Sequence, residues 1–265
     1  MTDLEIMELE GGLKFWTRTG TNDHSTIYAS AHEDEYGLSD EDVYGKLVFD
    51  VGAYVGSVGV WLASRGARVV CVEPVPVNAD LIRRNAELNE VDVVVVEAAA
   101  GEEGEQIVRW GFTADPDWND RVAEDVTLGA LHTDQTRISI AHHGFVGSTH
   151  RDAPVDQAYE ERVVPSMSLA RLVQEYGVPY IIKIDCEGGE WPWLADPLMQ
   201  FVRLVVGEWH PWDTVQGAEG VGGFRGYRGA AHDRCNQDSI RALLDTHLVE
   251  FSGPEGGPGG FRATR

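Results

Sequence analysis

The sequence has 265 residues, of which 44 are acidic and 21 are lysine or arginine, so its formal net charge is −23. That balance argues against a nucleic-acid partner, because phosphate binding needs a basic face. With no apolar run of about 18 to 20 residues, a polar start and three scattered cysteines, we expect a cytoplasmic protein without a membrane span, a signal peptide or a disulfide framework.

Short apolar runs alternate with helical segments from residue 46 onward. Gly66 follows the first helical segment as a C-terminal cap, and Asn78 is placed as the N-cap of the second. The third apolar run is nearly continuous, which predicts burial on both faces of a sheet. We therefore expect strands at 46–52, 67–74 and 91–100 and helices at 57–66 and 78–89, the pattern of a doubly wound parallel sheet.

Residues 101–165 interrupt this rhythm with two expected strands, at 105–110 and 136–143, among polar turns. A Gly-rich stretch at 211–235 is a candidate lid. The first 45 residues are expected to form short strands on the edge of the core, so the whole chain, 1–265, is interpreted as a single domain with two insertions. The remaining expected elements are helices at 166–177, 191–201 and 239–247, strands at 180–185 and 202–210, and a closing hairpin of 248–253 with 259–265.

Acidic residues end all five expected parallel strands. Because ligands of such sheets bind outside the carboxyl ends of the strands, at the point where the strand order reverses, these acids predict a site there. A purely structural sheet has no need of acids at every strand end. The five residues are Asp50, Glu73, Glu97, Asp185 and Glu208.

The first turn, "FDVGAYVGSVG", has glycines at Gly52 and Gly56 and lacks the G-x-G-x-x-G spacing that cradles a dinucleotide. Glu73 is placed where a carboxylate can accept both hydroxyls of a ribose. A glycine loop without diphosphate geometry, flanked by acids, suits the cationic S-adenosylmethionine (SAM) and disfavours a nicotinamide dehydrogenase. The expected SAM-binding residues are Asp50, Gly52, Ala53, Tyr54, Gly56, Glu73, Pro74, Glu97, Ala98 and Asp185.

Four segments, "FDVGAYVG", "VEPVPVNADLIRRNAELN", "IIKIDCEGGEWPWL" and "VVGEWH", together resemble the FkbM family of SAM-dependent methyltransferases. The resemblance implies an α/β, Rossmann-like class I fold, with a mainly parallel seven-stranded sheet, an antiparallel last strand and helices on both faces. It implies methyl transfer, most often to a hydroxyl of a polyketide, sugar or other small molecule. Tyr54 departs from the family's usual Asn, and Ala170 stands where an Asp is usual.

Within this interpretation Asp185, nearest the strand end, is expected to face the transferred methyl group. His210 is the candidate general base for a hydroxyl acceptor, with Asp185 as the fallback. Glu190 is expected mainly to begin a helix, where an acid is favoured by the helix dipole. The expected acceptor-binding residues are Glu187, Glu208, Trp209 and Arg225.

Several alternatives stay open at this point. The acceptor atom is oxygen or nitrogen, and a non-catalytic SAM-binding protein of the same fold fits the same motifs. His142, His143 and His150 lack the spacing of a metal site, and we expect none. With only three lysines, the positive charge is nearly all arginine, which fits either a high-GC genome or a salt-adapted host. The oligomeric state and the acceptor itself do not follow from the sequence.

Overall fold

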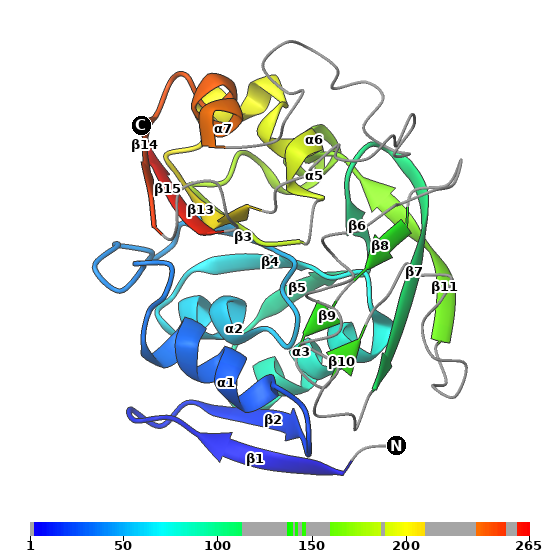
Figure 1. Ribbon diagram of the computed structural model, residues 1–265. Coiled ribbons are helices and arrows are strands. Elements are labelled where there is room, and N and C mark those ends of the chain that lie inside the picture. The colour runs from blue at the N-terminus through cyan, green and yellow to red at the C-terminus, as the bar shows by residue number, and fades with distance from the viewer. Residues whose placement is uncertain are drawn as a thin grey trace.

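A computed structural model of the chain describes residues 3–112, 137–139, 141–142, 145–146, 160–186, 189–209, 237–252 and 259–265. At its centre is a seven-stranded sheet with the order β14-β15-β13-β12-β3-β4-β5 (Figure 1). The strands are β3 (Leu47–Val51), β4 (Arg68–Val72), β5 (Val93–Val96), β12 (Ile181–Ile184), β13 (Leu204–Trp209), β14 (Leu248–Phe251) and β15 (Gly259–Thr264).

The strands from β5 to β13 run parallel, and β15 pairs antiparallel with both β13 and β14. The chain moves outward from β3 in one direction through β4 and β5, and from β12 in the other through β13. The strand order therefore reverses between β3 and β12, where a ligand of such a sheet is expected. The expected fold class is confirmed, including the antiparallel last strand and the closing hairpin.

Helices cover both faces of the sheet, as Figure 1 shows. The side chains of β3 alternate between these layers: Val48 belongs to the same buried cluster as Leu62 of α2, whereas Phe49 packs in the cluster that contains Leu172 of α5. One layer holds α2 (Ser57–Ser64) and α3 (Pro76–Leu88), and the other holds α5 (Leu169–Tyr176), α6 (Glu190–Leu194), the 3-10 helix η2 (Pro197–Phe201) and α7 (Gln237–Leu243).

Three details differ from the sequence-based expectation. Helix α3 begins at Pro76, whose ring fixes the first helical φ and lacks the N–H that would go unbonded there, so Asn78 is inside the helix rather than its cap. The helix expected over 191–201 is divided, because Pro197 disfavours helical geometry at Asp196 and starts η2. The apolar run ending in β5 forms an edge strand rather than a doubly buried one, and Val94 is 44% exposed.

The segment between β5 and α5 forms a second sheet with the order β6-β11-β7-β10-β9, in which β8 also pairs with β7. The strand expected at 105–110 lies within β7, and the strand expected at 136–143 is represented by β8 and β9 in the described residues. The strands are β6 (Ala99–Ala100), β7 (Gly104–Phe112), β8 (Arg137–Ser139), β9 (Ala141–His142), β10 (Phe145–Val146) and β11 (Glu160–Met167).

The N-terminal residues form the hairpin of β1 (Leu4–Glu8) and β2 (Lys14–Arg18), followed by α1 (Asp23–Ile27) and the π-helix η1 (Tyr28–His32). Short strands were expected here, whereas their pairing as a hairpin and the two helical turns were not. Helix α3 holds the hairpin, since Asn85 accepts a 2.6 Å hydrogen bond from the backbone N–H of Trp16 and Asn89 bonds both backbone groups of Lys14. Among the described parts of the chain, none of the helices combines the length and the apolarity that crossing a bilayer requires.

Candidate functional site at the reversal of strand order

The glycine loop between β3 and α2 packs directly against the end of β12. Gly52 has φ +70°, and a Cβ there would lie 1.7 Å from the carbonyl oxygen of Asp185, so only glycine fits. Gly56 has φ +81° and precedes α2, with its would-be Cβ 2.9 Å from Ile82. Ala53 is buried and donates its N–H to Val72 on the neighbouring strand. Gly52 and Ala53 thus bring the loop against both neighbouring strands, and Gly56 brings it against α3.

A buried ion pair supports this loop from beneath. Lys183 Nζ lies 3.3 Å from Asp50 Oδ1, an ion pair without aligned hydrogen-bond geometry, and donates a 2.9 Å hydrogen bond to the carbonyl of Gly52. Asp50 Oδ2 accepts the N–H of Gly59 in α2. Burial lowers the pKa of Lys183, but the carboxylates of Asp50 and Asp185 outweigh it and hold that pKa above its usual value.

Burial raises the pKa of Asp50, whereas Lys183 opposes this shift. The proton lies on Lys183 and Asp50 is charged, because both the ion pair and the Gly59 N–H stabilise the carboxylate. Asp50 therefore shapes the loop through Lys183, and its own side chain is fully buried below the loop.

Glu73, at the end of β4, is 2% exposed and already engaged by the chain. Its oxygens accept the N–H groups of Tyr54 and Val75, both at 2.9 Å, and the side-chain amide of Asn78 at 3.2 Å. Burial raises the pKa of Glu73 to about 7, although these hydrogen bonds oppose the shift. Three of the roughly four acceptor positions of the carboxylate are thus used within the chain.

Tyr54 connects the glycine loop to the N-terminal segment. Its φ is +53°, in the left-handed region that Asn adopts more readily than Tyr. The replacement of the family's Asn by Tyr therefore falls at a position with an uncommon backbone conformation. The Tyr54 hydroxyl donates a short hydrogen bond to Asp23 and lies 3.0 Å from Asn22 Oδ1. Asp23 forms a buried ion pair with Arg18 at 2.8 Å, and Arg18 also donates to Asn78. The residue at position 54 therefore anchors the segment that leads from β2 into α1.

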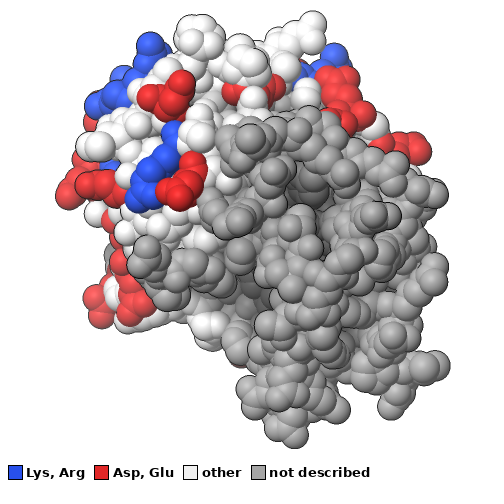
Figure 2. Space-filling view, turned by 45° about the horizontal axis from the view of Figure 1, so that its top comes forward, with Lys and Arg blue, Asp and Glu red and all other residues white. Residues whose placement is uncertain are grey.

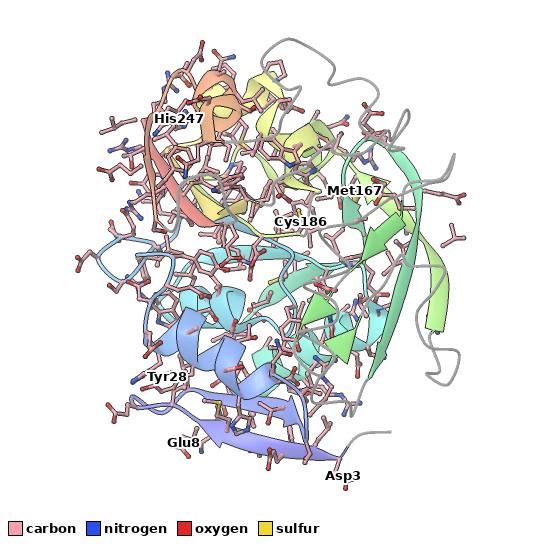
Figure 3. All side chains as sticks on the ribbon, in the orientation of Figure 1. Asp3, Glu8, Tyr28, Met167, Cys186 and His247 are labelled. Atoms are coloured by element: carbon pink, nitrogen blue, oxygen red, sulfur yellow. The ribbon has the colours of Figure 1, made fainter. Side chains whose placement is uncertain are left out.

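At the end of β12, Asp185 is met by a residue from the N-terminal segment. The Tyr36 hydroxyl donates a 2.9 Å hydrogen bond to Asp185 Oδ2, and the Lys183 ammonium lies 5.4 Å from the centre of the Tyr36 ring. Burial and the charges of Asp185, Glu35 and Glu208 raise the pKa of Tyr36 well above its ordinary value, so the phenol remains a donor. Cys186, labelled in Figure 3, follows Asp185 at this end of the strand.

The carboxylate of Glu35 belongs to the same group. Partial burial and the nearby charges of Glu208 and Asp185 raise the pKa of Glu35 to about 7, while Lys183 acts in the opposite direction. Glu208, on β13, is half-buried. Asp185 and Glu208, at the ends of β12 and β13, thus lie near Glu35 of the N-terminal segment, and Lys183, which opposes the shift, is paired with Asp50 and bonded to Gly52.

The other expected site residues are spread more widely. Glu97 lies at the surface, where it pairs with Arg83 at 2.6 Å, and Pro74 and Ala98 are buried near the ends of β4 and β5. Trp209 is fully buried in the core, and no hydrogen-bond partner of its indole N–H lies in the described residues. Outside the described residues lie Glu187, His210, Arg225, His143 and His150. Among the residues that the structure describes, no group of three or more potential metal ligands occurs.

Glu190 begins α6, as expected, but its side chain is fully buried. The thiol of Cys186 lies 3.7 Å from Glu190 Oε2. The sequence predicted only its place at the helix start; the structure adds that the carboxylate lies in the interior, near the end of β12. Removing its charge therefore affects the packing of this turn as well as the helix end.

Residues 50–236 match a family model that is described as a methyltransferase FkbM domain. This span covers the glycine loop, Glu73 and Asp185. The chain belongs to the FkbM methyltransferase family. The resemblance inferred from the four sequence segments is confirmed, and with it the assignment to methyltransferases. No curated protein matches the sequence significantly.

Solved structures that resemble this FkbM domain include methyltransferases of several kinds. Magnesium protoporphyrin IX methyltransferase from Synechocystis PCC 6803, with bound SAM, is 12% identical with a TM-score of 0.41; the alignment covers 91% of this chain and 78% of that one. Precorrin-6y C5,15-methyltransferase from Geobacter metallireducens is 11% identical, with a TM-score of 0.43 and coverages of 98% and 94%. The 16S rRNA N2 G1207 methyltransferase of T. thermophilus, with AdoMet and guanosine, is 12% identical, with a TM-score of 0.45 and coverages of 100% and 51%.

At these identities and scores the likeness concerns the general fold and decides neither the acceptor nor the site residues. None of these structures tests the expectation that nucleic acid is excluded as an acceptor. That exclusion stays a prediction from the net charge.

The sequence analysis missed Tyr36, whose hydroxyl meets Asp185, and its neighbour Glu35. Tyr36 lies 149 residues from Asp185 along the chain, and no spacing connects them. The only available signal was an acid and an aromatic residue in a polar segment just before the first parallel strand. That signal is too common to single out a site.

Proposed function

We propose that the protein transfers a methyl group from SAM to a hydroxyl group of a small-molecule, sugar or natural-product acceptor. The observation that supports it best is the packing of the family's glycine loop on Asp185, at the reversal of strand order. The proposal is finer than the family assignment in two respects, the acceptor atom and the acceptor class.

The carboxylates on the β12 side of the site complement the positive charge of SAM. SAM carries a sulfonium and an ammonium group, and Glu35, Asp185 and Glu208 gather negative charge beside Tyr36. On the β4 side, Glu73 is the expected ribose ligand, and its one remaining acceptor position leaves room for a single hydroxyl while the loop donors stay in place. Binding through both hydroxyls requires Glu73 to release the Tyr54 or the Val75 N–H.

SAM supplies an activated methyl group, so the C–S bond breaks as the bond to the acceptor oxygen forms, leaving S-adenosylhomocysteine (SAH). The chain's contribution is proximity, alignment and exclusion of water. Asp185 is proposed to face the reacting carbon, because it ends β12 beside Gly52. His210 is proposed to take the acceptor's proton, since it follows β13 directly in the sequence.

Methyl transfer is tested with SAM carrying an isotopically labelled methyl group. The protein is incubated with panels of hydroxylated metabolites, glycans and amines, and products that gain one labelled methyl are identified by mass spectrometry. Gain on a hydroxyl compound supports the proposal. Gain only on amines favours N-methylation. SAM binding by calorimetry without turnover on any acceptor favours a non-catalytic SAM-binding protein.

The same experiment includes total RNA as an acceptor, because the fold leaves that class open. The net charge of −23 opposes binding to a polyanion. On the described part of the face shown in Figure 2, acidic and basic side chains are interspersed, without a continuous basic patch there. Labelling of RNA at the rate of the best small molecule would contradict the proposed acceptor class.

A further inference from the structure

A buried ion pair in the N-terminal segment lies next to the glycine loop. The Arg18 guanidinium donates to both carboxylate oxygens of Asp23 at 2.8 Å, and the Arg18 backbone N–H donates to the same carboxylate, also at 2.8 Å. Burial opposes the charge of Asp23, but the guanidinium outweighs burial and holds the pKa of that carboxyl below its usual range. The charged pair lies where β2 packs beside α3 and α1 beside α2 (Figure 1).

Asn78 connects this pair to Glu73, the expected ribose ligand. Asn78 is fully buried, its Oδ1 accepts a 2.8 Å hydrogen bond from Arg18, and its Nδ2 donates to Glu73 Oε1 at 3.2 Å. A guanidinium can only donate, and an ionised carboxylate can only accept. The presence of Arg18 on one side of the amide therefore fixes its orientation, with the donor end on Glu73.

Asp23 acts on Glu73 by a second route, through the glycine loop. The Tyr54 hydroxyl donates to Asp23, and the Tyr54 backbone N–H donates to Glu73 Oε2 at 2.9 Å. Because a φ of +53° is uncommon for a bulky residue, the anchored ring helps to hold the backbone conformation that aims this N–H. The ion pair thus supports two of the three donors that hold the Glu73 carboxylate, one on each oxygen.

We propose that Arg18 and Asp23 are positioning residues of the methyl-donor site. They act through Asn78 and Tyr54, and they aim the one remaining acceptor position of Glu73 at a ribose hydroxyl of SAM. This inference rests on the proposed function, with Glu73 as the ribose ligand, and it makes the N-terminal segment part of the donor site. An ion pair that only stabilised the fold would affect all ligands of the site alike, whereas a positioning pair is required for recognition of the hydroxyl.

The experiment is calorimetric titration of the full chain with SAH and with its 2′-deoxy and 3′-deoxy analogues. The parent should bind one of the two analogues about tenfold more weakly than SAH, because that analogue lacks the hydroxyl whose hydrogen bond Glu73 accepts. Arg18→Lys keeps the charge opposite Asp23, but its ammonium lacks the planar fork that serves Asp23 and Asn78 together. This variant should distinguish the same analogue by about twofold or less, and it should bind SAH about fivefold more weakly than the parent.

The matched control is Asn89→Ala. Asn89 fastens the same N-terminal hairpin, since its side chain bonds the backbone N–H and carbonyl of Lys14 at 2.9 and 2.6 Å. Within the described part of the chain it makes no hydrogen bond to Glu73. The control should keep the SAH affinity and the discrimination of the parent. If it lost that discrimination, loosening the hairpin would be sufficient and the proposal would be overturned.

Parent-like discrimination in a folded Arg18→Lys would overturn the proposal, even if this variant bound every ligand more weakly, and would leave the proposed function intact. Tyr54→Phe removes only the hydroxyl that meets Asp23, and it should lower the discrimination at least about twofold. If Arg18→Lys does not fold, parent-like discrimination in Tyr54→Phe overturns the proposal in its place. A parent that binds SAH without distinguishing either analogue would overturn the proposal and the role of Glu73, and a parent that binds neither SAM nor SAH would overturn the proposed function as well.

Discussion

Replacing Gly52 by alanine tests the close packing between the glycine loop and the end of β12. At φ +70° an alanine costs about 1–2 kcal/mol relative to a relaxed backbone. Its Cβ would lie 1.7 Å from the Asp185 carbonyl oxygen, where real Cβ atoms essentially never come within 3.0 Å, so the two backbones must separate by about 1.3 Å. Overpacking of this kind costs a further ~1–3 kcal/mol.

Gly45 provides the matched control, since its φ is +67° and nothing lies within 4 Å of a would-be Cβ. For Gly45→Ala, urea unfolding should show a loss of about 1–2 kcal/mol in the free energy of unfolding, and a thermal melt should show a Tm lower by roughly 2–8 °C. Its SAM affinity should be unchanged. Gly52→Ala should lose a further ~1–3 kcal/mol and bind SAM at least tenfold more weakly. Equal losses in the two variants, with equal SAM affinity, would refute the packing argument.

Four further predictions concern charge and chemistry. Asp185→Asn should fold normally but slow single-turnover methylation about tenfold or more, because charge in a water-poor site acts at low effective dielectric; an active variant would remove Asp185 from the transfer site. His210→Ala should keep its SAM affinity and lose about 10²-fold in methylation rate, and the parent rate should fall as the pH drops through the histidine pKa; full activity would exclude a base role. The raised pKa of Glu73, about 7 against an ordinary 4.5, means that the folded state holds this proton more tightly than the unfolded chain. Its contribution to stability is complete below about pH 4.5 and is lost as the pH rises through 7, so urea unfolding of Glu73→Gln between pH 5 and pH 8 should lose this slope relative to the parent, and an unchanged slope would contradict it. Raising KCl from 0.1 to 1 M should increase the Tm, because the Debye length shrinks from about 10 to about 3 Å and screens the repulsion of a net charge of −23; a constant or lower Tm would count against acidic repulsion.

Much of the framework could be predicted from local patterns. Alternating apolar runs and helical segments identified all five parallel strands, and general rules for such sheets then placed the site at their carboxyl ends. Gly52 was assigned to a tight turn because of its spacing, and the structure confirms its left-handed backbone. The FkbM elements supported the same arrangement. Edge and centre were not distinguishable: the valine run of β5 looks like a buried strand, and only the final strand order leaves Val94 exposed.

The order of elements, the glycine loop and the acids at the strand ends could be predicted locally, because each depends on residues close together in the chain. What each acid contacts depends on the folded arrangement. It turned Asp50 inward onto Lys183, surrounded Glu73 with loop donors and brought Tyr36 to Asp185 across 149 residues. The pKa of a carboxylate depends on burial and on charges within a few ångströms, and those neighbours come together only when the chain folds.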